Sequence, residues 1–144
     1  MAAAQEYEPN ATPWVRAQLE KIDRTGDTRS VSMHDRHVVV VIMTGVRTGK
    51  ARRVPLMRVE HDGAYAAVAS KGGAPRDPVW LRNLVANPDV TVQDGTVVFE
   101  RRARLVEGDE RARWWERAVA AYPPYAQYQT RTRRRIPVFV LEPR

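Results

Sequence analysis

The stretch HVVVVIMTGVRTGKARRVPLMRVE, residues 37–60, decides the fold because it contains two strand-like segments joined by a glycine-containing turn. Residues 37–43 are apolar and mostly β-branched after the histidine, a pattern typical of a strand that is buried on both faces. Residues 54–60 form a second candidate strand, and residues 44–53 turn the chain between them. We therefore expect these two strands to pair as neighbours in a sheet.

Two Asp-Gly turns continue this hairpin pattern along the chain. The turn His61-Asp62-Gly63 follows the second strand, and Asp94-Gly95 joins two later strands. The further strands that we expect cover 64–69, 90–93, 96–105 and 138–141. Because most of the strand connections are hairpin-like, an antiparallel sheet or small barrel with peripheral helices fits better than a parallel doubly wound sheet.

Three helices are expected around these strands. The first begins at Thr12-Pro13, where an N-cap residue precedes a proline, and ends near Asp23. Its expected apolar stripe is Trp14, Val15, Gln18, Leu19 and Ile22. The second runs from Asp77-Pro78 to about Asn87, and the third opens at Gly108-Asp109. The face expected to be buried on the third is Ala112, Trp115, Val119 and Tyr122.

Length and composition predict one domain, residues 12–144, after a flexible segment at 1–11. The absence of cysteine excludes disulfides and thiolate metal sites. The net charge of +7 favours an anionic partner such as nucleic acid, a phosphorylated cofactor or an acidic membrane surface. The first residues lack an apolar stretch, and the apolar run 38–43 is too short to span a bilayer. We therefore expect a cytoplasmic protein.

The turn TGVRTGKARR, residues 44–53, is not a Walker loop. Three residues rather than four separate Gly45 from Gly49, and Lys50 is followed by Ala51 rather than by serine or threonine. No GxGxxG motif is present either. The turn still offers backbone amides and the side chains of Arg47, Thr48, Lys50, Arg52 and Arg53. It is either a cradle for an anion or a solvated basic hairpin.

Two later motifs have chemical potential. In ASKGGAPRDPVWLRN, residues 69–83, a glycine-rich turn precedes a helix, as in sites for anions or carbonyl oxygens, although an ordinary connector with Trp80 in the core is the alternative. In AYPPYAQYQ, residues 121–129, Pro124 begins a short turn that carries Tyr125 and Tyr128 on one side. These phenols either contact an aromatic ligand and donate a proton, or simply cover the end of the barrel.

Two other residue groups give weaker signals. His34, His37 and His61 lack metal-ligand spacing, so no metal site is expected. The arginine run RTRRR, residues 131–135, is typical of a solvated basic loop, with contact to nucleic acid or acidic lipid left open. Because no nucleic-acid-binding module is recognisable, we expect no nucleic-acid partner and at most peripheral contact with the inner face of the membrane.

The motifs TG-x-RTG-x-x-R, VPL, ASKGG, DPVWLRN, YPPYAQYQ and IPVFVLEP follow one another over residues 44–143. In this order the chain resembles the deazaflavin-dependent nitroreductase family of actinobacteria, which includes F420H2-dependent quinone reductases. The resemblance implies a split β-barrel of the flavin-reductase (FMN-binding) type with peripheral helices. It also implies hydride transfer from reduced coenzyme F420 to a quinone-like or nitroaromatic acceptor.

The resemblance further implies which residues contact the coenzyme, whose phosphodiester and polyglutamate tail suit arginines. Contacts with the phosphate and tail are implied for Val46, Arg47, Thr48, Arg52, Arg53, Val54, Pro55, Leu56 and Met57. Contacts beside the deazaflavin ring are implied for Val68, Ala69, Ser70, Lys71, Val79, Trp80, Leu81, Arg82, Asn83 and Tyr125. A hydroxyl donor should stabilise the acceptor after hydride transfer, and the candidates are Ser70, Tyr125 and Tyr128, with Tyr122 as a further one.

Two positions depart from the family pattern. Met57 stands where some nitroreducing relatives have a tyrosine, which favours a quinone-like acceptor over a nitroimidazole, and Val46 stands where relatives are often basic.

Two alternatives remain open from the sequence. One is a split-barrel protein that binds FMN or haem, and the other is a non-enzymatic basic protein that binds nucleic acid or lipid.

Overall fold

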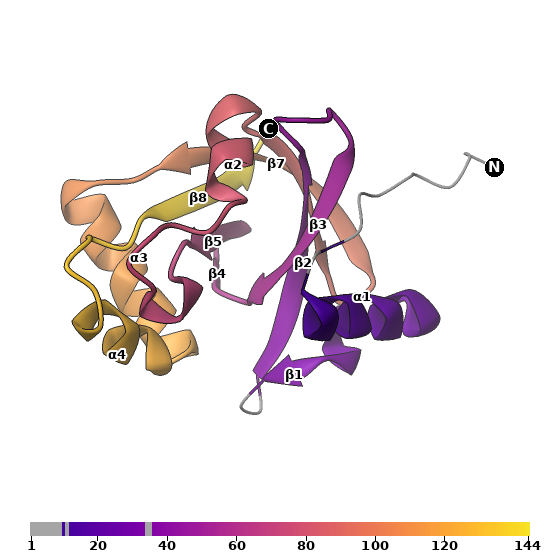
Figure 1. The fold of residues 1–144 in the computed structure, drawn as a ribbon, viewed down its shortest axis with the longest axis horizontal. Helices are drawn as coiled ribbons and strands as arrows, with labels where there is room; N and C mark the ends of the chain where they lie inside the picture. Colours follow the sequence, from indigo (N-terminus) through magenta and orange to yellow (C-terminus); the bar gives the residue numbers. More distant parts are fainter. Residues whose placement is uncertain (1–9, 11, 34–35) are drawn as a thin grey trace.

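The computed structural model describes residue 10, residues 12–33 and residues 36–144 (Figure 1). The strands are β1 (Ser32–Met33), β2 (Arg36–Thr44), β3 (Ala51–Met57), β4 (Glu60–His61), β5 (Ala64–Val68), β6 (Asp89–Asp94), β7 (Val97–Leu105) and β8 (Val138–Pro143). The helices are α1 (Pro13–Thr25), η1 (Thr28–Ser30), η2 (Lys71–Gly73), α2 (Leu81–Ala86), α3 (Gly108–Ala121) and α4 (Pro124–Thr130). Apart from Asn10, the segment 1–11 that was expected to be flexible lies outside the described residues, as does His34.

All strand pairs in the described part of the chain are antiparallel, and the strand order is β1-β2-β6-β7-β8-β5-β4, with β3 paired to β2. In Figure 1, α1 lies beside β2 and β3, whereas α3 and α4 lie on the other side, near β5 and β8. The expected antiparallel architecture with peripheral helices is confirmed. Because β3 pairs on one side only, Pro55 removes no hydrogen bond that a second neighbour would need.

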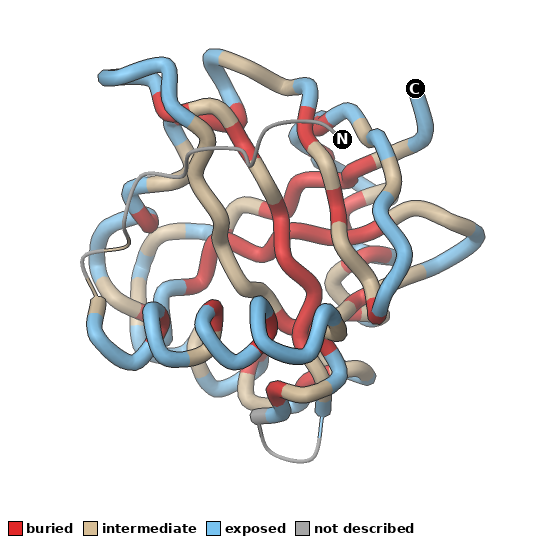
Figure 2. Tube along the Cα trace, turned by 90° about the vertical axis from the view of Figure 1, so that its right-hand side faces the viewer, coloured by how far each residue is buried: buried red, intermediate tan, exposed pale blue. Residues whose placement is uncertain are grey.

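The strand β2 separates two hydrophobic cores, which explains its uninterrupted apolar sequence. Val38 and Val40 pack in a core with α1, α3 and α4, and Val39, Val41 and Met43 pack in a second core with β6, β8 and α2. Residues alternate between the two faces of a strand, so both faces must be apolar. Figure 2 shows that buried residues concentrate along the middle of the strands and exposed ones on the loops and the outer side of the helices.

Two expected elements differ in their extent. The second strand was expected over 54–60, but β3 begins at Ala51 and ends at Met57, and the short β4 follows. The helix expected from Asp77-Pro78 begins only at Leu81, and Trp80 occupies its N-cap position. The side chain of Asp77 instead forms an ion pair with Arg134 at 2.8 Å. Asp77, which the sequence analysis assigned to a helix cap, therefore makes a tertiary contact instead.

Two predicted helix faces are partly wrong. On α1, Val15, Leu19 and Ile22 are buried as expected, but Trp14 is 57% exposed. On α3, the buried side chains are Arg111, Trp114 and Ala118, followed by Tyr122, and Ala112 is exposed. Of the predicted face, Tyr122 is buried, while Trp115 and Val119 are only partly buried and pack at the edge of the core. Because one of the buried residues is the polar Arg111, the apolar pattern of the sequence did not identify this face.

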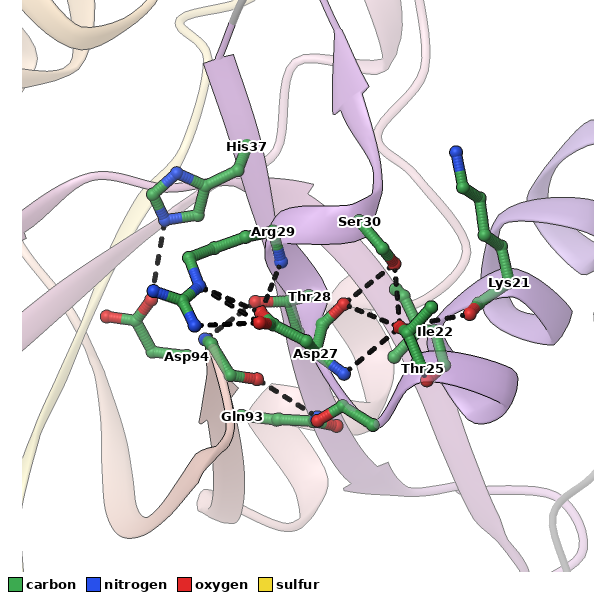
Figure 3. Close-up of polar contacts among 12 residues, drawn as sticks. Lys21, Ile22, Thr25, Asp27, Thr28, Arg29, Ser30, His37, Gln93 and Asp94 are labelled. Atoms are coloured by element: carbon green, nitrogen blue, oxygen red, sulfur yellow. Dashed lines mark hydrogen bonds and ion pairs between the residues drawn. The ribbon is translucent and has the colours of Figure 1, made fainter.

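A polar cluster ties the start of β2 to the turn between β6 and β7 (Figure 3). Asp94 accepts hydrogen bonds from Arg58 Nε at 2.9 Å and from the Tyr65 hydroxyl at 2.7 Å, and His37 Nε2 lies 3.6 Å from its other oxygen. Beside it, the hydroxyl of buried Thr28 accepts a hydrogen bond from the Gly95 amide at 2.7 Å. Burial opposes the charge on Asp94, but the hydrogen bonds from Tyr65 and Arg58 hold its pKa below the usual 3.8.

Asp94→Asn is expected to lower the free energy of unfolding at pH 7 by about 2 kcal/mol, because the hydrogen bonds lose their charge. Since the folded-state pKa of Asp94 is depressed, its contribution is present above the unfolded-state value and is lost as the pH falls below 3.8. Chemical unfolding at several pH values measures both effects. Asp89→Asn is the control, because its half-exposed side chain forms only long ion pairs, at 3.7 Å with Arg102 and at 4.0 Å with Arg144. Equal losses in the two variants would contradict this account.

Candidate functional site

Two adjoining cavities lie between the start of α1, β3 and the loop around η2. Their volumes are about 500 and 350 Å³. Residues that line both are Asn10, Thr12, Val54, Lys71, Pro78 and Trp80. The cavities are therefore parts of one groove, with different chemistry at its two ends.

The larger cavity is mainly apolar, with hydroxyl groups on one side. Consecutive residues of the edge strand β3, Val54 to Met57, form one wall. Val68 and Ser70 at the end of β5, together with Trp80, form another. Tyr122, Tyr125 and Tyr128 close the cavity from the α3–α4 side. An apolar cavity with a few polar groups is typical of a site for a flat organic ligand.

The three tyrosines form one packed group. The ring of Tyr125 meets those of Tyr122 and Tyr128 edge-on, with centroids 5.0 and 6.1 Å apart. The hydroxyls of Tyr122 and Tyr128 are 3.1 Å apart and share a hydrogen bond. Burial, followed by this hydrogen bond, raises the pKa of Tyr122 to about 12, and burial also raises the pKa of Tyr125. These two phenols therefore stay protonated at neutral pH and can donate hydrogen bonds.

The smaller cavity is cationic. Its lining includes Arg52, Arg53, Lys71 and the buried Asn83. Arg53 forms a bidentate ion pair with Asp23 of α1, so part of its charge is neutralised. Asn83 accepts a hydrogen bond from the Val46 amide at 2.9 Å, whereas its buried Nδ2 donates to no group of the described residues. A buried donor without a partner costs free energy, which a ligand oxygen would recover.

The loop that joins the two cavities has an unusual backbone. Lys71 has φ of 45°, a conformation that is costly for a residue with a side chain. Gly73 has φ of 81°, and a Cβ atom there would lie 2.5 Å from the carbonyl oxygen of Tyr128. This glycine lets η2 pack directly against α4. The packing fixes Ser70 and Lys71 relative to the tyrosines.

Gly73→Ala is expected to destabilise the fold by about 1–3 kcal/mol more than Gly72→Ala, because the new methyl group overlaps the backbone of α4. Gly72 is the matched control, since it has a similar φ of 63° but a Cβ atom there would meet nothing within 4 Å. Chemical unfolding of both variants gives the comparison. A loss of stability that is no larger for Gly73→Ala would show that the close packing of η2 on α4 is wrong.

Arg134 holds the same loop from the other side, which corrects an expectation. The run 131–135 was expected to be a solvated basic loop, but the side chain of Arg134 is only 15% exposed. Its guanidinium donates to the carbonyl oxygens of Ala69, Ser70 and Ala74 at 2.8–3.0 Å and to the carboxylate of Asp77 at 2.8 Å. Arg134 is therefore a structural clamp on residues 69–77.

The structure brings most of the predicted site residues to the groove, but not all of them. Those that line it are Arg52, Arg53, Val54, Pro55, Leu56, Met57, Val68, Ser70, Lys71, Val79, Trp80, Asn83, Tyr125 and Tyr128, together with Tyr122. Val46, Arg47 and Thr48 lie exposed on the β2–β3 turn, Arg82 is exposed on α2, and neither they nor Ala69 and Leu81 line the groove. Whether these residues contact the coenzyme stays a prediction.

Several groove residues were missed in the sequence. They are Asn10, Thr12, Trp14, Val15, Gln18, Val38, Gly72 and Pro78. The signal that could have found Trp14 is the position of a large aromatic residue on the first turn of α1, next to but outside the buried stripe. Among the helices that the structure describes, none combines the length and apolar character needed to cross a membrane.

Comparison with known proteins shows the family to which the chain belongs. Residues 14–143 match the model of a family described as F420H(2)-dependent quinone reductase. The F420H(2)-dependent quinone reductase Rv1261c of Mycobacterium tuberculosis is 42% identical over 101 residues, which cover 68% of each chain.

Two solved structures are more similar still. One, described as an F420-H2 dependent reductase (FDR-A), is 57% identical, with a TM-score of 0.71 over 78% of this chain and 99% of that one. Another, described as a domain-swapped dimer, is 56% identical, with a TM-score of 0.74 over 90% of this chain and 97% of that one. The expected split β-barrel is thereby confirmed. With its sequence matched over 130 residues, 14–143, the chain belongs to the F420H(2)-dependent quinone reductase family.

Proposed function

We propose that the protein transfers a hydride from reduced coenzyme F420 to a quinone, with the acceptor in the tyrosine-lined cavity and the coenzyme along the groove. The observation that carries this proposal is the direct connection of an apolar cavity of about 500 Å³ to a cationic one of about 350 Å³. Membership of the family favours coenzyme F420 over FMN or haem, and over a non-enzymatic basic protein.

The residues of the groove fit this coenzyme. A flat ring suits the apolar walls formed by β3 and Trp80, and an anionic tail suits the side chains of Arg52 and Lys71. The unpartnered Nδ2 of Asn83 supplies a buried hydrogen-bond donor for an oxygen of the coenzyme. Lys71 lines both cavities, so we assign it to the junction between the ring and the tail.

The coenzyme supplies the hydride, and the protein residues position the reactants and manage the charge. Met57, Leu56 and Trp80 provide apolar surface that excludes water from the reacting atoms. When a quinone accepts a hydride, negative charge develops on its oxygen. We assign hydrogen-bond donation to this oxygen to the hydroxyls of Ser70 and Tyr128, with Tyr125 as a further donor. The hydrogen bond between the hydroxyls of Tyr122 and Tyr128 would orient the Tyr128 hydroxyl.

The direct test is to mix the protein with reduced F420 and a soluble naphthoquinone, and to follow the appearance of oxidised coenzyme. We expect oxidation that depends on both protein and quinone. Tyr128→Phe should lower kcat by about tenfold or more and change the dissociation constant of the coenzyme little, because the lost donor acts on the acceptor. A rate equal to that of the protein-free mixture would refute the proposed reaction.

Nitroaromatic acceptors are expected to be poorer substrates. Met57 is 7% exposed and lines the larger cavity. A methionine has no hydroxyl, whereas the family resemblance implies a tyrosine at this position in some nitroreducing relatives. A parallel assay with a nitroimidazole measures the preference. The cytoplasmic location expected from the sequence also stays a prediction, which cell fractionation would test.

A further inference from the structure

A third cavity, of about 400 Å³, lies away from the groove, where β7 ends and α3 begins. The segment that leads into β8 forms its other side. Its lining consists of Leu105, Val106, Glu107, Gly108, Arg111, Arg135, Ile136 and Pro137. None of these residues lines the two cavities of the coenzyme groove. The proposed function therefore uses none of them.

Arg111 is the unusual member of this cavity. Arg111 is only 8% exposed, and the central carbon of its guanidinium lies 5.0 Å from the centroid of the Trp115 ring. Its Nη2 donates to the carbonyl oxygen of Ile136 at 2.6 Å. No carboxylate within the described residues forms an ion pair with it. Buried arginines are usually paired with an anion, because removal of a charge from water is costly.

A second arginine increases this imbalance. Arg135 is exposed, lines the same cavity and lies close enough for its charge to act on Arg111. Burial lowers the pKa of Arg111, and the like charge of Arg135 lowers it further. Glu107 is the acidic residue of the lining, but it is exposed and pairs with neither arginine in the described structure. Glu110, on the first turn of α3, is held instead by Arg104 at 2.8 Å.

We propose that this cavity binds a phosphate group that carries an apolar substituent. The guanidinium groups of Arg111 and Arg135 would contact the phosphate oxygens, and the first turn of α3, which begins at Gly108, would add its partial positive charge. Leu105, Val106, Ile136 and Pro137 would contact the substituent. A volume of about 400 Å³ leaves room beyond a bare phosphate. Two guanidinium forks offer more donors than the two oxygens of a carboxylate accept, which favours a phosphate.

The test is a titration of the protein with phenyl phosphate, followed by NMR signals of the backbone amides of 105–111 and of the arginine Nε–H groups. Arg135→Gln removes one charge from an exposed position and should preserve the fold. Arg133→Gln is the matched control, because Arg133 is exposed in the same arginine run and does not line the cavity. Arg52→Gln separates this cavity from the coenzyme groove.

We expect shifts at 105–111 in the wild-type protein, with a dissociation constant about tenfold higher in Arg135→Gln and unchanged in Arg133→Gln and Arg52→Gln. Arg111→Gln should remove the binding, and its folding is checked by the rest of the spectrum. No shift at 105–111, or the same affinity in Arg135→Gln, would overturn the proposal. Equal affinity for inorganic phosphate would also overturn it, since the apolar wall would then contribute nothing.

A phosphate group with an apolar substituent has two sources, a soluble monoester and a lipid headgroup. Sedimentation with vesicles of phosphatidylcholine that contain phosphatidic acid, compared with phosphatidylcholine alone, distinguishes them. Binding to the acidic vesicles that is lost in Arg135→Gln but retained in Arg133→Gln supports the site with a lipid as its ligand. Equal loss in both variants indicates general attraction of the basic surface and contradicts a specific cavity.

Discussion

Arg134→Met is expected to weaken the binding of coenzyme F420 by about 30-fold, or roughly 2 kcal/mol, although Arg134 does not line the groove. The guanidinium makes four hydrogen bonds to residues 69–77. Methionine occupies similar space but leaves the carbonyl oxygens of Ala69, Ser70 and Ala74 without these donors. The loop that positions Ser70 and Lys71 should then become mobile. Because the coenzyme would have to order this loop on binding, its affinity would fall.

The neighbouring Arg133 provides the control. Its side chain is exposed, so Arg133→Met removes the same charge without loosening the loop. Arg134→Lys is a second comparison, because it keeps the charge but lacks the planar fork that reaches several oxygens at once. We expect it to restore only part of the affinity. Equal affinities for Arg133→Met and Arg134→Met, measured by titration of the coenzyme fluorescence, would show that charge rather than the clamp matters.

Lys71→Gln is expected to weaken coenzyme binding by about tenfold or more, since a hydrogen bond to a charged group contributes roughly 1.5–3 kcal/mol. Lys71 lies at the junction of the two cavities, where the anionic part of the coenzyme would leave the ring. The dissociation constant should also depend less on salt in this variant than in the wild-type protein. Titrations at two ionic strengths measure both effects.

Lys50→Gln is the matched control for Lys71. Lys50 lies exposed on the β2–β3 turn and lines neither cavity of the groove. Its replacement should change the affinity by less than about twofold, because an exposed charge at a distance is screened. If Lys50→Gln weakened binding as much as Lys71→Gln did, the tail would lie on the turn rather than in the groove.

The sequence predicted the sheet well because its strands carry strong local signals. The run 37–43 is apolar on both faces, and Asp-Gly turns mark two of the hairpins. The alternation of β2 between two cores confirms this interpretation. The ordered motifs also located most residues that line the groove, since VPL lies on β3, ASKGG on the η2 loop, DPVWLRN at the start of α2 and YPPYAQYQ on α4.

The missed features depend on contacts between distant residues. Asp77 resembled a helix cap, but Arg134, which is 57 positions away in the chain, pairs with it. Arg111 broke the apolar pattern of α3 because a buried arginine has no place in a hydrophobic stripe. Trp14 was assigned to the core from its spacing, yet it lies at the edge of the groove. Local periodicity carries no information about such tertiary partners.

One groove, between β3, the η2 loop and the tyrosines of α4, is proposed to hold the coenzyme. The most direct measurement is a titration of the labelled protein with oxidised F420, in which the backbone amide signals are followed by NMR. We predict saturable shifts with a micromolar dissociation constant, concentrated at residues 52–57, 70–73 and 80–83. Absence of binding at high coenzyme concentration, or shifts confined to residues outside the groove, would contradict it.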